Sequence, residues 1–73
     1  MREIAKKRTK EILHKIRKRR IEKEYSQEYV GIQLGIGQVA YHKLENGKTR
    51  LRIDTLLQLA TILDVNATYF LEE

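Results

Sequence analysis

Two glycines, Gly35 and Gly37, separate two short segments with apolar residues at helical spacing, and this turn constrains the fold more than any other feature of the sequence. Ser26 is a favoured N-cap residue, so the first segment predicts a helix over residues 27–34. Gly35 suits the left-handed position that ends a helix, and Gly37 is predicted to be the N-cap of a helix over residues 38–46. Two short helices joined by so tight a turn must cross closely.

Gly31 lies inside the first of these helices, where glycine costs about 1 kcal/mol relative to alanine. A close helix crossing at Gly31 would explain it, because a side chain would hold the next helix away. The alternative is that Gly31 is incidental. Ile36, between the two glycines of the turn, is predicted to point into the core together with Val30 and Leu34.

Two charged residues interrupt apolar stripes at helical spacing. Arg20 ends the apolar stripe of a long first helix over residues 4–23. Glu45 occupies the inward stripe that Tyr41 and Leu44 begin on the helix after the turn. Because an unpaired buried charge is costly, we expect Arg20 and Glu45 to form an ion pair between the two helices.

Two more helices complete an all-α chain. The segment over residues 53–63 is apolar around more than half of its circumference, which is typical of a helix that is central or also contacts a partner. Asn66 is a suitable N-cap for a short last helix. The predicted inward positions of the fourth helix are Ile53, Leu56, Leu57, Ala60 and Leu63. The predicted homodimer contacts in this region are Leu59, Ile62, Tyr69 and Phe70, although a partner protein is an alternative occupant.

The positive charge is concentrated at the start of the chain. Residues 1–24 carry a net charge of +7 and the remainder −2, which gives the +5 of the whole chain. Such a block suits a polyanionic partner, but a solvated helix face is an equally good reading of charge alone. We divide the chain into a basic extension over residues 1–10, either an arm or the first turns of a helix, and a domain over residues 11–73.

Several classes of function are disfavoured. The chain has no Cys, so neither disulfides nor zinc thiolates can stabilise it. His14 and His42 lie on different predicted helices without a carboxylate cluster, so we expect no metal and no cofactor. No nucleophile and base occur at a supporting spacing, and we expect no enzyme activity. With no long apolar run and no secretory h-region, the expected location is the cytoplasm, in association with the nucleoid, and a basic helix lying on anionic lipid is the weakest reading.

From about residue 13 to residue 71 the sequence resembles the phage-repressor/Cro (XRE-type) helix-turn-helix family. The residues that carry the resemblance are Ile16-Arg17 with Arg20, Tyr25-Ser26-Gln27-Glu28, Val30-Gly31 with Leu34-Gly35-Ile36, Lys43-Leu44-Glu45-Asn46-Gly47-Lys48, and Leu56-Leu57-Gln58-Leu59-Ala60 with Leu63-Asp64-Val65. The resemblance implies a compact, lambda-repressor-like five-helix bundle in which helices 2 and 3 form the helix-turn-helix. It also implies binding to double-stranded operator DNA, usually as a dimer.

The same resemblance assigns roles to individual residues. The positions that read base edges are Gln38, Val39 and Lys43. The positions that contact phosphate are Gln27, His42, Asn46, Lys48, Arg50 and Arg52, with His42 contacting either phosphate or nothing. Gln27 is also placed where it can brace Gln38. In relatives the positions of Arg20 and Glu45 can form a buried ion pair.

Two departures from the family pattern carry structural predictions. Tyr41 stands where a smaller aliphatic residue is usual, so the third helix is expected to be displaced or the hydroxyl to reach solvent. Arg52 stands where a Ser or Thr usually caps the fourth helix, so that cap is expected to be absent.

The function that these features favour is a sequence-specific transcription regulator, a repressor, that reads the major groove with residues 38–46 as a dimer on a palindromic operator. The alternative is a protein-interaction module such as an antitoxin, with DNA binding secondary or autoregulatory.

Overall fold

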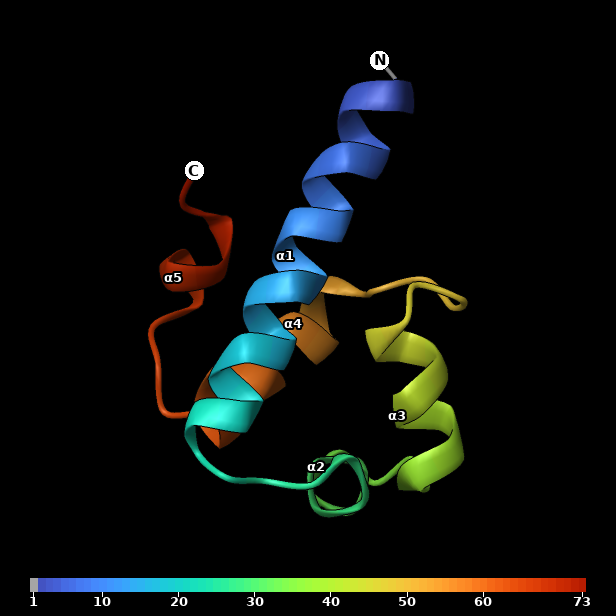
Figure 1. The fold of residues 1–73 in the computed structure, drawn as a ribbon, viewed down its shortest axis with the longest axis vertical. Coiled ribbons are helices and arrows are strands. Elements are labelled where there is room, and N and C mark those ends of the chain that lie inside the picture. Colours follow the sequence, from blue (N-terminus) through green and yellow to red (C-terminus); the bar gives the residue numbers. More distant parts are fainter. Residues whose placement is uncertain (1) are drawn as a thin grey trace.

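The computed structural model describes residues 2–73, which form five helices and no strand (Figure 1). The helices are α1 (Arg2–Glu22), α2 (Gln27–Leu34), α3 (Gly37–Glu45), α4 (Ile53–Ile62) and α5 (Ala67–Leu71). The all-α, five-helix prediction is confirmed. The predicted bounds of α2 are those observed, α3 both begins and ends one residue earlier than predicted, and α4 ends one residue earlier.

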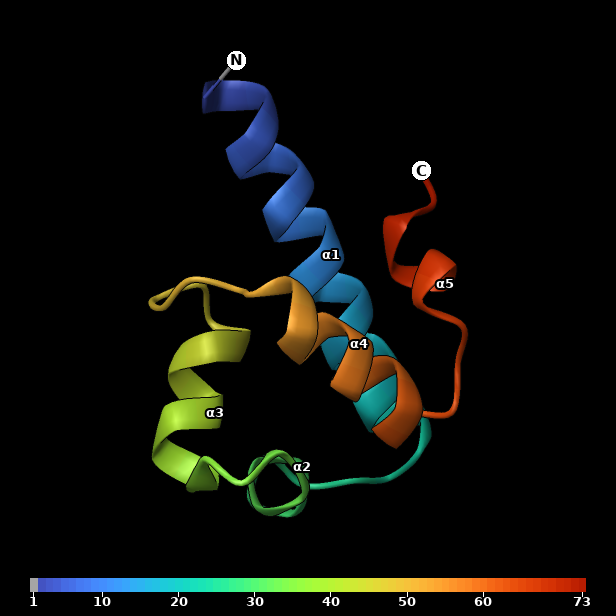
Figure 2. The same ribbon diagram turned by 180° about the vertical axis from the view of Figure 1, so that it is seen from behind.

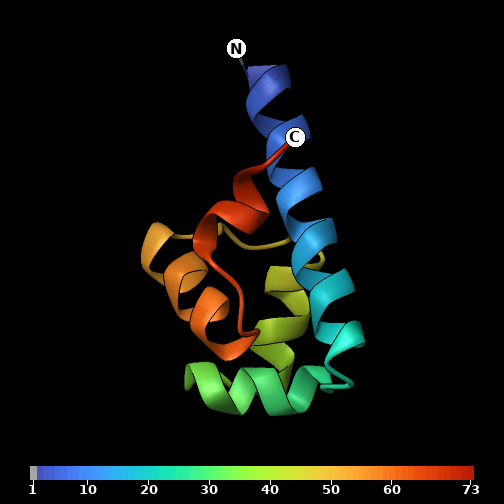
Figure 3. The ribbon, with the colours of Figure 1, turned by 90° about the vertical axis from the view of Figure 1, so that its left-hand side faces the viewer.

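The longest helix, α1, lies at the centre of the arrangement. It contacts α3 on one side and α5 on the other, and its first turns project beyond the rest of the bundle (Figures 1 and 2). The short helix α2 crosses the opposite end and packs against α3 and α4 (Figure 3). The start of α1 and the C-terminal end of the chain lie toward the same end of the molecule. Within residues 2–73, no helix is both long and apolar enough to cross a membrane.

The core is formed by one or more residues from every helix. Its buried apolar side chains are Leu13, Ile16, Val30, Tyr41, Leu44, Leu56, Leu59, Ala60, Leu63 and Phe70. The predicted inward face of α4 is correct only in part. Leu56, Ala60 and Leu63 are buried as predicted, but Ile53 is 73% exposed and Leu57 is 54% exposed, whereas Leu59 is completely buried. The physical reason is that α4 is apolar around more than half of its circumference, so two different stripes satisfy the helical period and only the neighbouring helices decide between them.

The ends of α2, α4 and α5 follow the predicted capping chemistry, but the predicted N-cap of α3 is wrong, because Ile36 is the N-cap and Gly37 is the first helical residue. The Ser26 hydroxyl accepts a hydrogen bond from the Tyr29 amide at 2.9 Å at the start of α2. The Asn66 side chain accepts from the Thr68 amide at 3.1 Å at the start of α5. Arg52 provides no side-chain cap to α4, as its substitution for Ser or Thr predicts. Each capped helix thereby satisfies one backbone donor that would otherwise be unpaired.

The turn between α2 and α3 depends on its glycines. A Cβ on Gly31 would lie 2.6 Å from the Gly37 carbonyl carbon and closer still to its oxygen, so α2 and α3 meet with no space for a side chain. Gly35 and Gly37 both have positive φ, of 77° and 84°. The prediction that Ile36 points inward is wrong, because it is 44% exposed. The Gly37 backbone occupies the space against α2 that the Ile36 side chain would need.

Three basic side chains of α1 attach the C-terminal helices to it. Arg8 donates to the Leu71 carbonyl at 2.7 Å, and Arg19 donates to the Leu63 carbonyl at 2.9 Å. Lys15 donates to the carbonyls of Tyr69 and Glu72. The acceptors lie near the ends of α4 and α5, where carbonyls have no partner within the helix. Part of the basic block therefore stabilises the fold.

Candidate nucleic-acid interface

Helix α3 has one buried face and one exposed face. Tyr41, Leu44 and Glu45 are buried, and they fix the helix against the bundle. The outward side chains are Gln38, Val39, His42 and Lys43, with Asn46 directly after the helix, and all of them are exposed. Val39 is 71% exposed, although an aliphatic side chain gains nothing from contact with water. Figures 1 and 2 place α3 at one side of the molecule, where its outer face is not covered by another helix.

Arg20 and Glu45 form a bidentate ion pair that joins α1 to α3. The Arg20 Nε and Nη2 atoms each lie 2.9 Å from a carboxylate oxygen of Glu45. The remaining Nη1 donates to the Tyr25 carbonyl at 2.8 Å. The side chains are 11% and 1% exposed, so water does little to screen their attraction. The pair fixes the end of α3 relative to the longest helix.

The surroundings of this pair shift two pKa values. Burial alone would raise the pKa of Glu45, but hydrogen bonds, chiefly from Arg20, outweigh it and hold the pKa below its usual value of 4.5. Burial raises the pKa of Tyr41 well above its usual range, and the nearby Glu45 carboxylate raises it further. The Tyr41 hydroxyl is itself buried and, among residues 2–73, has no hydrogen-bond partner of acceptable geometry. The prediction that it reaches solvent is therefore wrong: α3 packs closely enough to enclose the whole side chain.

A chain of polar side chains leads from this pair to the exposed face of α3. Gln27 Nε2 donates to Glu45 Oε1 at 3.2 Å, and Gln27 Oε1 lies 3.1 Å from His42 Nδ1. Asn46 Nδ2 lies 2.9 Å from His42 Nε2. The predicted bracing of Gln38 by Gln27 is wrong, since within residues 2–73 Gln27 bonds to Glu45 and His42 instead. Glu45 attracts the Gln27 amide more strongly than the neutral side chain of Gln38 would, because the acceptor oxygens of Glu45 carry negative charge.

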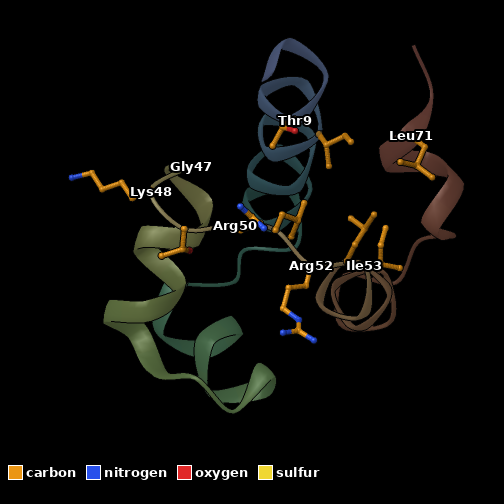
Figure 4. A pocket seen from close by; sticks show the side chains of 11 residues that line it. Thr9, Gly47, Lys48, Arg50, Arg52, Ile53 and Leu71 are labelled. Carbon is orange, nitrogen blue, oxygen red and sulfur yellow. The ribbon is translucent and has the colours of Figure 1, made fainter. Parts of the chain in front are cut away.

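The loop between α3 and α4 carries three exposed basic residues that point in different directions. Figure 4 shows Lys48 extending away from the bundle beside α3, whereas Arg52 points below the start of α4. Arg50 lies between them along an open groove of about 510 Å³. The Arg52 guanidinium is paired with Asp54 at 3.2 Å, although both side chains are well exposed. Lys48 is thus the member of this group that extends beside α3.

Known proteins offer a comparison for this order of helices and for the closely packed α2–α3 pair with its exposed outer face. A family model described as helix-turn-helix matches residues 16–70. The chain belongs to this helix-turn-helix family, of the XRE or Cro type. No match to the chain was found among curated proteins or among solved structures.

Membership of the helix-turn-helix family gives the chain its general role. The domain binds DNA, and its fold is a DNA-binding fold rather than an enzymatic one. The matched residues include α2 and α3 complete, together with α4 and most of α5. Among residues 2–73, no three His, Asp or Glu side chains gather as a metal site would require. The basic residues before residue 16 lie outside the matched segment.

The predicted dimer contacts need correction in this helix-turn-helix domain. Leu59 and Phe70 are completely buried within one chain, so neither side chain can contact a second copy. Ile62 and Tyr69 are partly buried against the same core. The exposed apolar side chains of α4 are instead Ile53 and Leu57, one helical turn apart. The predicted dimer contacts on α4 were wrong for the reason already given for its inward face: two stripes of α4 satisfy the helical period, and the sequence does not show which one is buried.

The sequence analysis did not predict that some basic side chains of residues 1–24 have a structural role. Arg8, Lys15 and Arg19 form hydrogen bonds within the domain, so they are not free to bind a partner. Their spacing of seven and four residues places them on one face of α1, and this spacing was visible in the sequence. The carbonyls that accept from them are not marked by any residue type, so the sequence alone could not identify that face as structural.

Proposed function

We propose that this helix-turn-helix domain is a sequence-specific transcription regulator that acts as a repressor by placing α3 in the major groove of its operator. The observation that supports the proposal is the contrast between the two faces of α3. Its inner face is fixed by Tyr41, Leu44 and Glu45, while its outer face presents Gln38, Val39 and Lys43 without any structural partner among the described residues. A helix held rigidly with one face free suits insertion into a groove about 12 Å wide.

The chemistry of the outer face suits base edges. A Gln side chain can form two hydrogen bonds with adenine N6 and N7, so Gln38 would select an A·T pair. Val39 offers an apolar contact to a thymine methyl group, and Lys43 can donate to guanine O6 and N7. Together these three residues would select the identity of adjacent or nearby base pairs in the operator.

Phosphate contacts would hold α3 in register. Asn46, Lys48 and Arg50 lie at and after the end of α3 and are exposed. His42 and Gln27 would contribute through their shared hydrogen bond, which orients both side chains beside Asn46. Arg52 would have to exchange Asp54 for a phosphate before it could contribute. Such contacts supply most of the affinity and make it depend on salt.

Two copies of the domain would bind a palindromic operator, with their α3 helices about 34 Å apart. The exposed pair Ile53 and Leu57 supports a dimer seam at the start of α4 in place of the seam expected from the sequence. Sedimentation equilibrium of the wild type and of Ile53→Glu tests this seam. We expect a dimer that the substitution dissociates, and unchanged association would exclude Ile53 from the interface.

Selection of bound duplexes from a random DNA pool at near-physiological salt tests the function as a whole. We expect enrichment of a palindromic consensus, and a reporter gene carrying that site near its promoter should be repressed. Failure to enrich any sequence would contradict the proposal.

A second candidate is a protein-interaction module such as an antitoxin, for which the exposure of Ile53 and Leu57 on one face is the favouring observation. A complex with a protein partner would bury both side chains. Light scattering with and without DNA separates the two candidates, because a pure interaction module would keep its mass when the selected duplex is added. Either candidate would act in the cytoplasm, and the regulator would act at the nucleoid.

A further inference from the structure

The helix α1 presents basic residues on two flanks of its buried stripe. Arg8, Lys15 and Arg19 form one flank and donate to carbonyls at the ends of α4 and α5. Lys6, Lys10 and Arg17 form the other flank, at intervals of four and seven residues. The second flank has no hydrogen bond or ion pair within residues 2–73. These three charges therefore have no structural role in the described fold.

The second flank borders a groove on the side of α1 that faces α3. The groove has a volume of about 560 Å³, and Lys6, Lys10, His14 and Arg17 line its α1 side. Asn46 and Gly47, which follow α3 directly, line its other side. Figures 1 and 2 show that the first turns of α1 continue past the loop that follows α3. The groove is thus continuous with the proposed DNA-binding surface and extends it along α1.

The charge of the groove is almost entirely positive. Among the described residues, Glu45 is the only acidic residue that lines it, and its carboxylate is already neutralised by Arg20. Three cationic side chains that converge without an internal partner attract anions. Lys6 and Arg17 are eleven residues apart, which is about 16 Å along a helix and comparable to a run of about five phosphates along one DNA strand.

We propose that this groove is a second phosphate-binding site, which holds the DNA backbone beyond the base pairs that α3 reads. The inference rests on the proposed function, since it requires that α3 is already placed on a duplex. It extends that function by assigning a ligand to Lys6 and Lys10, which lie outside the segment that matches the helix-turn-helix family. The long first helix is then part of the DNA-binding surface, and the operator must be flanked by duplex for full affinity.

Two double variants with the same change of net charge test the proposal. Lys6→Gln with Lys10→Gln removes two charges from the groove. Lys7→Gln with Lys18→Gln removes two exposed charges that lie on α1 outside this groove. Binding of each variant to the selected operator is measured by fluorescence anisotropy over a range of salt concentrations. One duplex ends at the consensus, and a second extends roughly one helical turn, about 10 base pairs, beyond it on each side.

On the extended duplex, we expect the groove variant to reduce the slope of log K against log salt by about 4, because each of the two bound copies loses two phosphate contacts and each contact contributes about one unit. The control variant should keep the slope of the wild type. On the duplex that ends at the consensus, the two variants should bind alike. Circular dichroism verifies that helix content is retained, and the single substitutions Lys6→Gln and Lys10→Gln replace the double variant if it is not.

The possible failures are distinguishable. If the wild type binds the selected operator but both double variants give equal slopes on the extended duplex, the groove is not a phosphate site and the proposed function stands. If the slope falls equally on the short and extended duplexes, the contact lies within the consensus and the flanking site is excluded. If the wild type enriches no duplex from the random pool, the proposed function and this inference fail together.

Discussion

Gln27 donates a hydrogen bond to the buried carboxylate of Glu45 at 3.2 Å, so the first residue of α2 contacts the same charged group that joins α1 to α3. Three helices therefore meet at one carboxylate. The opposite end of the Gln27 amide contacts His42 on the exposed face. Any change at Glu45 should consequently affect both the stability of the fold and the order of side chains on the DNA-binding surface.

The pH dependence of stability should report the Glu45 ion pair. Its folded pKa lies below the usual 4.5, so its stabilising contribution is complete above about pH 4.5 and is lost as the pH falls through the folded pKa. Glu45→Gln leaves Arg20 buried without its charged partner and should lower the free energy of unfolding by about 3 kcal/mol at pH 7. Urea unfolding between pH 7 and pH 3 should show this difference shrinking in acid. Glu28→Gln, at an exposed position, is the control, and a difference independent of pH would contradict the assignment.

The contact between Gly31 and Gly37 should make Gly31 intolerant of a side chain. Gly31→Ala places a Cβ against the Gly37 carbonyl, so α2 and α3 must separate. We expect the free energy of unfolding to fall by about 1–3 kcal/mol, even though alanine is the better helix former. Chemical denaturation measures the change. Gln33→Ala, at an exposed position of α2, should be close to neutral, and an equally small effect of Gly31→Ala would show that the crossing is not tight.

The unpaired hydroxyl of Tyr41 should be a source of instability. Removing a buried polar group that lacks a partner recovers its desolvation cost, so Tyr41→Phe should raise the free energy of unfolding by about 1 kcal/mol. Thermal unfolding and urea unfolding both measure this change in the free energy of unfolding. Tyr29→Phe is the comparison, because Tyr29 is 41% exposed and should show little change. A loss of stability in Tyr41→Phe would mean that the hydroxyl donates to Glu45.

Two single substitutions should distinguish a residue that reads a base edge from a residue that contacts phosphate. Lys43→Ala should relax the preference at one base pair by about 1–3 kcal/mol, because Lys43 is proposed to contact a base edge. Arg50→Ala should weaken operator and random DNA alike and reduce the salt slope on the operator by about 2, one unit for each of the two bound copies. Competition binding with operator and random duplexes measures both effects. Equal losses on the two duplexes in both variants would rule out base reading by Lys43.

The sequence predicted best those features that one or two residues determine locally. Ser26 and Asn66 cap α2 and α5 because their side chains reach the nearby amides. The glycine at position 31 allows the close crossing of α2 and α3 that the sequence predicts, and Gly35 adopts the left-handed conformation that ends α2. The order and number of the helices follow from these punctuating residues together with apolar periodicity.

Features that depend on packing between helices were predicted less well. Ile53 and Leu57 satisfy the helical period as well as Leu59 does, and only the neighbouring helices decide which of them is buried. Ile36 is turned outward because the backbone of Gly37 occupies the space beside α2. Gln27 bonds to Glu45 rather than Gln38, which no local pattern indicates. Interactions with backbone carbonyls, as at Arg8 and Arg19, are invisible to residue identity.

The bonds from Arg8, Lys15 and Arg19 to carbonyls imply that ionic strength acts unequally on this chain. The carbonyl acceptors are neutral dipoles, whose attraction mobile ions screen far less than the attraction between separated full charges, although Arg8 and Arg19 also pair with nearby carboxylates. Contacts to phosphate respond much more strongly, through the release of counterions. A high-salt wash can thus elute the protein from DNA without loosening α5 from α1. Purification on immobilised DNA should return the domain folded, since the hydrogen bonds from Arg8, Lys15 and Arg19 to carbonyls do not depend on DNA.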